Sequence, residues 1–134
     1  MMPRRQPYAA YSPEEHVRIQ LGITESECTP TDDTPGVSVR FTITANLVST
    51  NAPVLRVKAL DAIARGHVYL AIDLATCPYA TGNGFKALAS IAGAARRAGG
   101  GLVVENASHD LVTLFDATGL SKLFTISDRN GVTP

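Results

Sequence analysis

Alternating apolar and polar positions predict two strands in the first third of the chain. From Val17 to Ile23 every second residue is apolar, which is the period of a half-buried strand over about residues 16–24. Residues 25–36 are rich in Pro, Thr and Asp and predict a loop. β-branched residues alternate again over 37–47, which predicts a second strand that could pair antiparallel with the first.

Helical apolar stripes and short apolar runs alternate through the rest of the chain. The expected elements are a helix from the cap candidates Ser49, Thr50 and Asn51 to about Gly66, a strand over 67–74, a helix over 84–98, a strand over 102–105, a helix from the cap residue Ser108 to Gly119, and a last strand over 123–126. The strand over 67–74 is apolar on both faces, as expected of a central parallel strand.

This order predicts an α/β fold. Strands separated by helices require right-handed parallel crossovers, so we expect one domain with a mixed central sheet of four to five strands and helices mainly on one face. The domain is expected at 15–128, between a flexible N-terminal tail at 1–14 and a C-terminal tail at 129–134. The stretch VSVRFTI, residues 37–43, could offer a sheet edge, but the sequence leaves the oligomeric state open.

Charge and hydropathy exclude several function classes. The chain of 134 residues has 12 Lys and Arg against 12 Asp and Glu, so no basic face for nucleic acid is expected. It contains no apolar run of 18 residues, so no membrane span is predicted. The N-terminal stretch lacks the apolar segment of a signal peptide, and a cytoplasmic location is expected.

Catalytic and metal-binding patterns are not found in the sequence. The three histidines share no ligand spacing with cysteines or acidic residues, so neither a metal nor another cofactor is predicted. Ser108, His109 and Asp110 are triad residue types, but neighbours at a helix start cannot adopt triad geometry. We therefore predict that the protein is not an enzyme. Cys77 is a candidate redox switch, with an inert buried thiol as the alternative.

A glycine-rich turn, Gly82-Asn83-Gly84, precedes the helix over 84–98. A dinucleotide-binding fingerprint would need a tighter turn after the strand that ends near Asp73, although Glu105 has the acidic spacing of that motif. The free N–H groups of a helix start can still attract an anion, so a small-anion or nucleotide site at 82–85 stays open. The alternative is that the glycines only allow the backbone to turn.

Four stretches in this order resemble the STAS domain family, as found in anti-sigma factor antagonists. The family stretch D-L-S-x-V-x-F-I-D-S-S-G-L-G-A-L is similar to residues 73–88 without a gap. Residues 96–104 resemble the family's basic helix end, Gly-Gly turn and apolar strand, and residues 118–126 match T-G-L-x-x-L-F-x-I. Upstream, residues 45–53 are similar to G-E-L-D-x-x-x-A-P. The resemblance covers about residues 15–128.

The resemblance implies a small mixed sheet with helices on one face and a regulatory role by partner switching. Antagonists of this family, which are bacterial regulators of sigma factors and so of transcription, bind an anti-sigma factor that is also a serine kinase. The kinase phosphorylates the first serine of the motif, and the added charge disrupts the complex. A protein partner is therefore expected at the loop and helix over 81–92. The implied partner-binding residues are Thr81, Gly82, Asn83, Gly84, Phe85 and Leu88.

The chain departs from the family pattern at the switch itself. The family's Asp falls on Thr81, its phosphorylated serine on Gly82, its second hydroxyl residue on Asn83, and the Asp of G-E-L-D on Val48. Gly82 cannot carry phosphate, so docking without phosphorylation at the usual position is expected. Thr81 is a candidate substitute phosphoacceptor, with a helix-cap threonine as the alternative. STAS domains also occur in transport and stress-sensing assemblies, so the partner's identity stays open.

Overall fold

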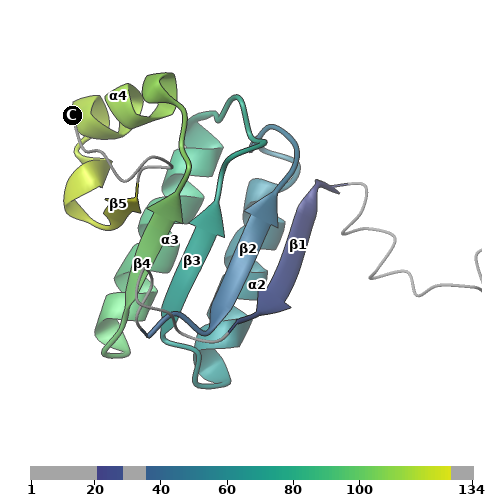
Figure 1. Cartoon of the computed structure of the whole chain (residues 1–134), viewed down its shortest axis with the longest axis vertical. Helices are drawn as coiled ribbons and strands as arrows, with labels where there is room; N and C mark the ends of the chain where they lie inside the picture. Colours follow the sequence, from purple (N-terminus) through teal and green to yellow (C-terminus); the bar gives the residue numbers. More distant parts are fainter. Residues whose placement is uncertain (1–20, 29–35, 128–134) are drawn as a thin grey trace, which may run out of the picture.

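The computed structural model describes residues 21–28 and 36–127 (Figure 1). Its elements are β1 (Ile23–Glu27), β2 (Val39–Ile43), α2 (Ala52–Ala64), β3 (Tyr69–Asp73), α3 (Gly82–Arg97), β4 (Gly101–Glu105), α4 (His109–Thr118), a 3-10 turn η3 (Leu120–Lys122) and β5 (Thr125–Ser127). The tails expected at 1–14 and 129–134 lie outside the described residues.

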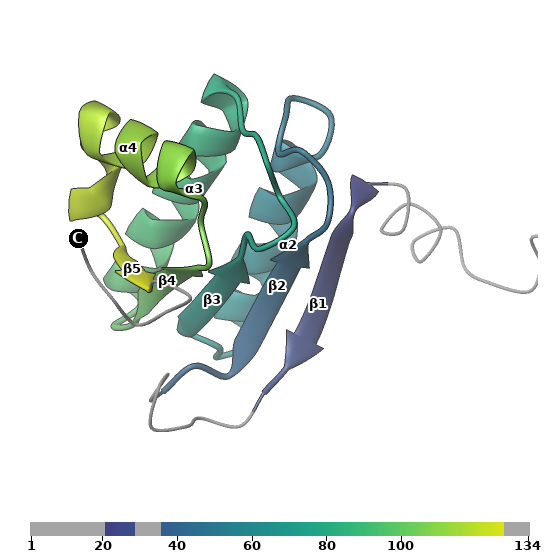
Figure 2. The ribbon, with the colours of Figure 1, turned by 45° about the horizontal axis from the view of Figure 1, so that its top comes forward.

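The strands form one mixed five-stranded sheet in the order β1-β2-β3-β4-β5. β1 is antiparallel to β2, and all other neighbours are parallel. α2 and α3 lie side by side on one face of the sheet, and α4 lies at its end beside β4 and β5 (Figures 1 and 2). The opposite face carries no helix within the described part of the chain. The predicted α/β fold is thus confirmed.

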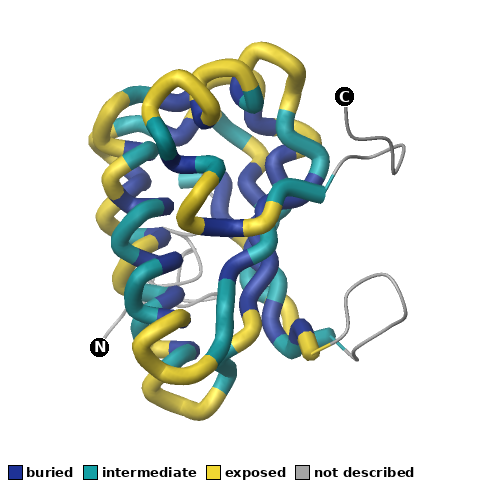
Figure 3. The backbone as a smooth tube through the Cα atoms, turned by 90° about the vertical axis from the view of Figure 1, so that its left-hand side faces the viewer, coloured by how far each residue is buried: buried dark blue, intermediate teal, exposed yellow. Residues whose placement is uncertain are grey.

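The core lies between the sheet and the two helices α2 and α3. Alternate residues of β2, β3 and β4 are buried, and so is one stripe of each helix. Figure 3 shows buried and exposed positions following one another along the helices. The inward side chains are Val39, Phe41 and Ile43 of β2, Leu70 and Ile72 of β3, Leu102 and Val104 of β4, Leu55, Ala59 and Ala62 of α2, and Leu88, Ile91 and Ala92 of α3. β3 buries Ala71 on its other face as well, as predicted for a central strand.

The strand predicted over 16–24 is wrong in position. Leu21 is helical and Gly22 is a turn residue with φ of +72°, so the strand begins only at Ile23 and runs through residues expected to be a loop. Residues 16–20 lie outside the described part. The predicted antiparallel pairing of the first two strands is confirmed. β2 is bonded on both sides, so VSVRFTI does not supply a sheet edge.

The later elements agree with the sequence within a few residues. The last strand covers Thr125–Ser127 rather than 123–126. Ser108 caps α4, since its hydroxyl accepts a hydrogen bond from the Leu111 amide at 3.1 Å. α4 ends at Gly119, whose φ of +80° is a left-handed conformation that glycine adopts without a steric penalty.

Candidate functional site

The loops that follow β2 and β3 are joined at the carboxyl end of the sheet. Leu47 and Ala80 form a parallel bridge. The Leu47 amide donates to the Tyr79 carbonyl at 2.9 Å, and the Thr81 amide donates to the Leu47 carbonyl at 3.0 Å. The loop before α3 is therefore held as a short extension of the sheet, which fixes where that helix begins.

Asn51 anchors the loop after β2, a role that the sequence did not reveal. It occupies the N-cap position of α2, as predicted, but its side chain makes no capping bond to the helix. It is 3% exposed; its Oδ1 accepts from the Val48 amide at 2.8 Å, and its Nδ2 donates to the carbonyls of Leu21 at 2.9 Å and Asn46 at 2.8 Å. The buried amide thereby joins the segment before β1 to the loop before α2.

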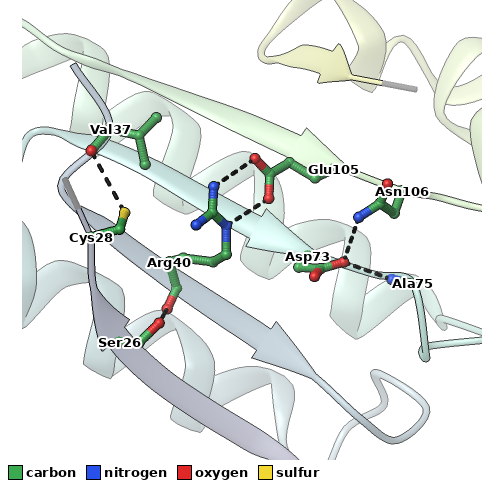
Figure 4. A network of polar contacts seen from close by, with 8 residues as sticks. All are labelled: Ser26, Cys28, Val37, Arg40, Asp73, Ala75, Glu105 and Asn106. Atoms are coloured by element: carbon green, nitrogen blue, oxygen red, sulfur yellow. Dashed lines mark hydrogen bonds and ion pairs between the residues drawn. The ribbon is translucent and has the colours of Figure 1, made fainter. Parts of the chain in front are cut away.

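Asp73 ends β3 and organises the next pair of loops (Figure 4). Its Oδ1 accepts hydrogen bonds from the Ala75 amide at 2.9 Å and from Nδ2 of Asn106 at 3.0 Å. Asn106 has φ of +59°, and its backbone N–H donates to the Ser127 carbonyl at 3.0 Å. The carboxylate thus shapes the loop after β3 and ties it to the loop after β4.

An ion pair crosses the face of the sheet that carries no helix (Figure 4). Nε of Arg40 lies 2.8 Å from Oε1 of Glu105, and Nη2 lies 3.0 Å from Oε2. The pair spans from β2 to β4 over β3, where Ala71 is the residue in register with Arg40. The hydrogen bond to Glu105 raises the pKa of Arg40 above its usual value, so the guanidinium stays charged.

The predicted partner-binding residues divide into exposed and buried groups. Gly82 and Asn83 are exposed at the first turn of α3, and a Cβ built on Gly82 would meet nothing within 4 Å. Gly84 and Leu88 are buried, and a Cβ on Gly84 would lie 2.8 Å from the Leu47 carbonyl oxygen. These two positions support the turn from beneath and present no surface of their own.

Phe85 lies half-buried between these two groups. Its ring contacts Phe115 edge-on at a centroid distance of 5.8 Å, and Phe115 contacts Phe124 at 5.4 Å. The three rings pack α3 against α4 and against Phe124 in the segment between η3 and β5, so Phe85 ties the start of α3 to the end of the domain.

Thr81 and Cys77 both face inward from the loop. Thr81 is the N-cap residue of α3 in an extended conformation, but its Oγ1 is buried and has no hydrogen-bond partner among the described residues. Cys77 is 1% exposed, and its Sγ donates to the Tyr79 carbonyl at 3.4 Å. Burial raises the pKa of the Cys77 thiol, which keeps it protonated and weakly reactive.

Tyr79 is an exposed aromatic residue that the sequence analysis missed. The residue is 55% exposed, and its carbonyl accepts a hydrogen bond from the Leu47 amide. An aromatic side chain on a fixed backbone is a frequent anchor in protein interfaces. The signal was a lone tyrosine within a loop that holds no charged residue from Leu74 to Phe85.

The described residues carry neither a metal-type cluster nor a membrane-type helix. No group of three or more His, Cys, Asp or Glu side chains gathers in the ranges 21–28 and 36–127 in a way that could hold a metal ion. Among the helices of these ranges, none combines the length and apolarity needed to cross a bilayer.

The comparison with protein families identifies the chain. The model of the STAS domain matches residues 29–131. The chain belongs to the STAS domain family. No curated protein matches the sequence of this STAS domain.

Solved structures share the fold at low sequence identity. A candidate anti-sigma factor antagonist of Thermotoga maritima is 14% identical with a TM-score of 0.62, over 75% of this STAS domain chain and 83% of that chain. The anti-sigma factor antagonist SpoIIAA of Bacillus, unphosphorylated, is 13% identical with a TM-score of 0.63, over 79% and 87%, and its phosphorylated form matches too.

The same fold occurs within a membrane transporter. The murine anion transporter Slc26a9 is 15% identical with a TM-score of 0.61, over 84% of this chain but only 22% of the transporter. The STAS fold is thus found both in antagonist-sized proteins and as a small part of a transporter.

Proposed function

We propose that this STAS domain is a regulatory protein-binding module that docks a protein partner through the loop and helix over 81–92. The partner class is an anti-sigma factor, including the type that is a serine kinase. The observation that carries the proposal is the exposed first turn of α3, where Gly82 and Asn83 face solvent on a loop fixed by its bridge to Leu47. A rigid, exposed turn binds with little loss of conformational entropy.

Docking at this turn is not controlled by phosphorylation at the family's usual position, which is Gly82 in this chain. SpoIIAA has the same fold and exists in unphosphorylated and phosphorylated forms, which supports a fold compatible with such a switch. In this chain the corresponding Gly82 has no hydroxyl, and the hydroxyl of Thr81 is buried. A kinase would have to open the start of α3 to reach Thr81, so we propose that neither residue is modified.

Binding to purified anti-sigma factor kinases from the source organism tests the docking site. Gly82→Asp places a carboxylate in the open space beside the turn, and Asn83→Asp adds the same charge next to it. We expect each variant to raise the dissociation constant of the complex at least tenfold. Tyr79→Ala should raise it by a similar factor. Gly82→Ala is the matched control, since it adds only a methyl group, and it should stay within twofold of wild type.

Phosphate analysis of the same mixtures tests the absence of a switch. With kinase and ATP, the wild type should carry no phosphate within residues 77–85, while Gly82→Ser should gain one phosphate and lose binding. Phosphorylation of the wild-type segment with partner release would overturn the proposal. Failure of every candidate kinase to bind, or equal binding by Gly82→Asp, would overturn it too.

A small-anion site at 82–85 is the second candidate function. Two observations favour it: the first turn of α3 has no acidic residue, and the Thr81 side chain makes no cap bond to the amides of that turn. A thermal shift with nucleotides, phosphate and sulfate at millimolar concentration decides this point, since a ligand far above its dissociation constant raises the melting temperature. A shift that is unchanged in Gly82→Asp would contradict a site at this turn.

A further inference from the structure

The outer face of the two sheet-covering helices is cationic, although the whole chain is neutral. Five cationic side chains lie on α2 and α3, namely Arg56, Lys58, Lys86, Arg96 and Arg97, against the single acidic side chain of Asp61. Lys and Arg balance Asp and Glu over the full sequence. The charges are therefore separated in space, and this face bears an excess of positive charge.

The N-terminal halves of α2 and α3 contain no carboxylate. Neither residues 44–60 nor residues 74–90 include an Asp or Glu. α2 and α3 follow neighbouring parallel strands and start at the same end of the sheet, so their positive dipole ends lie together (Figure 2). Arg56 and Lys86, each the fifth residue of its helix, are both exposed there.

The outward stripe of α3 is flat between its cations. Gly82, Lys86, Ser90, Gly93 and Arg97 follow one another at helical spacing on the side away from the core. Arg97 lies back along the helix, because a Cβ on Gly93 would be 3.2 Å from its Nη1. Lys86 and Gly93, beside which the Arg97 guanidinium lies, are seven residues apart, which is about 10 Å along the axis at 1.5 Å per residue, and only Ser90 lies between them on this stripe.

Three of these cations, Arg56, Lys86 and Arg97, have no carboxylate partner among the described residues. The ion pairs described there involve Arg40 with Glu105, and Arg65 with Glu25 and Asp61. No carboxylate of this part of the chain pairs with Arg56, Lys86 or Arg97. An oppositely charged partner could therefore approach Arg56, Lys86 and Arg97 without displacing a carboxylate of the described residues from them.

We propose that the α2–α3 face, defined by Arg56, Lys86, Ser90, Gly93 and Arg97, docks an acidic segment of a partner protein. The partner's carboxylates meet Lys86 and Arg97, and its backbone lies close over Ser90 and Gly93. The inference rests on the proposed function and extends its docking site from the first turn of α3 along the helix.

A protein segment fits this face better than a membrane or a nucleic acid. Juxtamembrane lipid-binding clusters use about 4–8 adjacent cations, and nucleic-acid-binding domains are basic overall. Here the sequence pI is about 6.8, and the cations of the α3 stripe are separated by small residues. Lys86 and Arg97 are single charges at the two ends of a stripe of small residues. They match carboxylates that are similarly spaced along one face of a helix in the partner protein.

Fluorescence anisotropy with designed peptides tests the charge match on the full chain. The probe is a labelled Ala-rich helical peptide with two Glu residues seven positions apart on one face, and its control has Gln at both positions. We expect the Glu peptide to bind at least tenfold more tightly at 50 mM NaCl, and this advantage to shrink at 300 mM NaCl because salt screens the charges.

Charge reversal on the protein locates the binding. Lys86→Glu with Arg97→Glu should weaken Glu-peptide binding at least tenfold, whereas Lys122→Glu, an exposed charge reversal on η3, should change it less than twofold. Equal affinity for the Glu and Gln peptides would overturn the inference. Binding to vesicles with 30% phosphatidylserine, or to a 16-nucleotide single-stranded DNA, that is tighter than binding to the Glu peptide would also overturn it, in favour of a lipid or a nucleic acid.

The two proposals fail in different ways. If a kinase partner binds and Gly82→Asp weakens it, while the charge-reversed double variant binds that partner and the Glu peptide like wild type, the docking site stands and the acidic-partner inference falls. If the Glu peptide binds as expected but no candidate kinase does, the partner class in the proposed function falls and the acidic-segment inference stands.

Discussion

Two glycines only two residues apart have opposite structural roles at the start of α3. A Cβ on Gly82 would meet open space, whereas a Cβ on Gly84 would lie 2.8 Å from the Leu47 carbonyl oxygen and 3.0 Å from its Cγ. The Leu47 carbonyl oxygen already accepts a hydrogen bond from the Thr81 amide, so it cannot move away from a Cβ on Gly84 without loosening the loop. Gly84 is needed for close packing, whereas a side chain at Gly82 would meet no packing constraint within the domain.

We therefore predict that Gly84→Ala destabilises the protein by about 1–3 kcal/mol, the usual cost of overpacking. Gly82→Ala should leave the free energy of unfolding unchanged or raise it by up to about 1 kcal/mol, since alanine favours the helix. Urea denaturation of both variants measures the difference. Equal stabilities would show that the turn and Leu47 are not packed as described.

The same residue-scale contrast shows what the sequence could and could not reveal. The motif over residues 73–88 predicted the position of the turn before α3. In that motif Gly82 aligns with the family's phosphorylated serine, which predicted that the usual phosphoacceptor is missing. The sequence did not show that the Thr81 hydroxyl is buried. Its burial depends on how the loop before α3 packs against the sheet and on its bridge to Leu47, which only the packed structure determines.

Elements with strong apolar periodicity were predicted well, and those without it were not. α3 begins and ends within two residues of its predicted range because its buried stripe repeats at helical spacing. β1 was misplaced because it is an edge strand with one buried residue, Ile23, followed by Thr24 to Glu27, which are polar. An edge strand that is mostly exposed has little hydrophobic alternation to detect, so its pairing with β2 determines its place.

Asn51 and Gly84 both fix the loop after β2. Gly84 does so by close packing, and Asn51 does so by hydrogen bonds. Its amide serves three backbone groups, and Asn51→Ala would leave them unpaired in a buried site. We predict a loss of about 2–4 kcal/mol in the free energy of unfolding. Asn51→Asp should be similarly destabilising, because it keeps the acceptor for Val48 but loses both donors.

Hydrogen exchange separates this loop effect from general unfolding. In a variant of Asn51, the amides of Val48 and Leu47 should exchange faster than in wild type, beyond the change that global stability alone produces. The amides of α4, which Asn51 does not contact, serve as the internal reference. Equal protection of the loop in both proteins would contradict the anchoring role.

At the scale of the whole molecule, one ion pair joins strands that are not neighbours. Arg40 of β2 and Glu105 of β4 meet over β3 with two hydrogen bonds, on a face that no described helix covers. Glu105 is only 8% exposed, so removing its partner leaves a carboxylate that water solvates poorly. Helix packing stabilises one side of the sheet, and this pair stabilises the other.

A double-mutant cycle measures how much the pair contributes. We predict that Arg40→Met lowers the free energy of unfolding by about 1–3 kcal/mol, and that adding Glu105→Gln recovers part of the loss because glutamine carries no charge. Arg65→Met is the matched control. Arg65 pairs with Glu25 and Asp61 at an exposed position, where solvent and salt screen the charges, so its loss should be smaller and should shrink further in high salt. A coupling between Arg40 and Glu105 no larger than that of the exposed pair would mean that helix packing alone maintains the sheet.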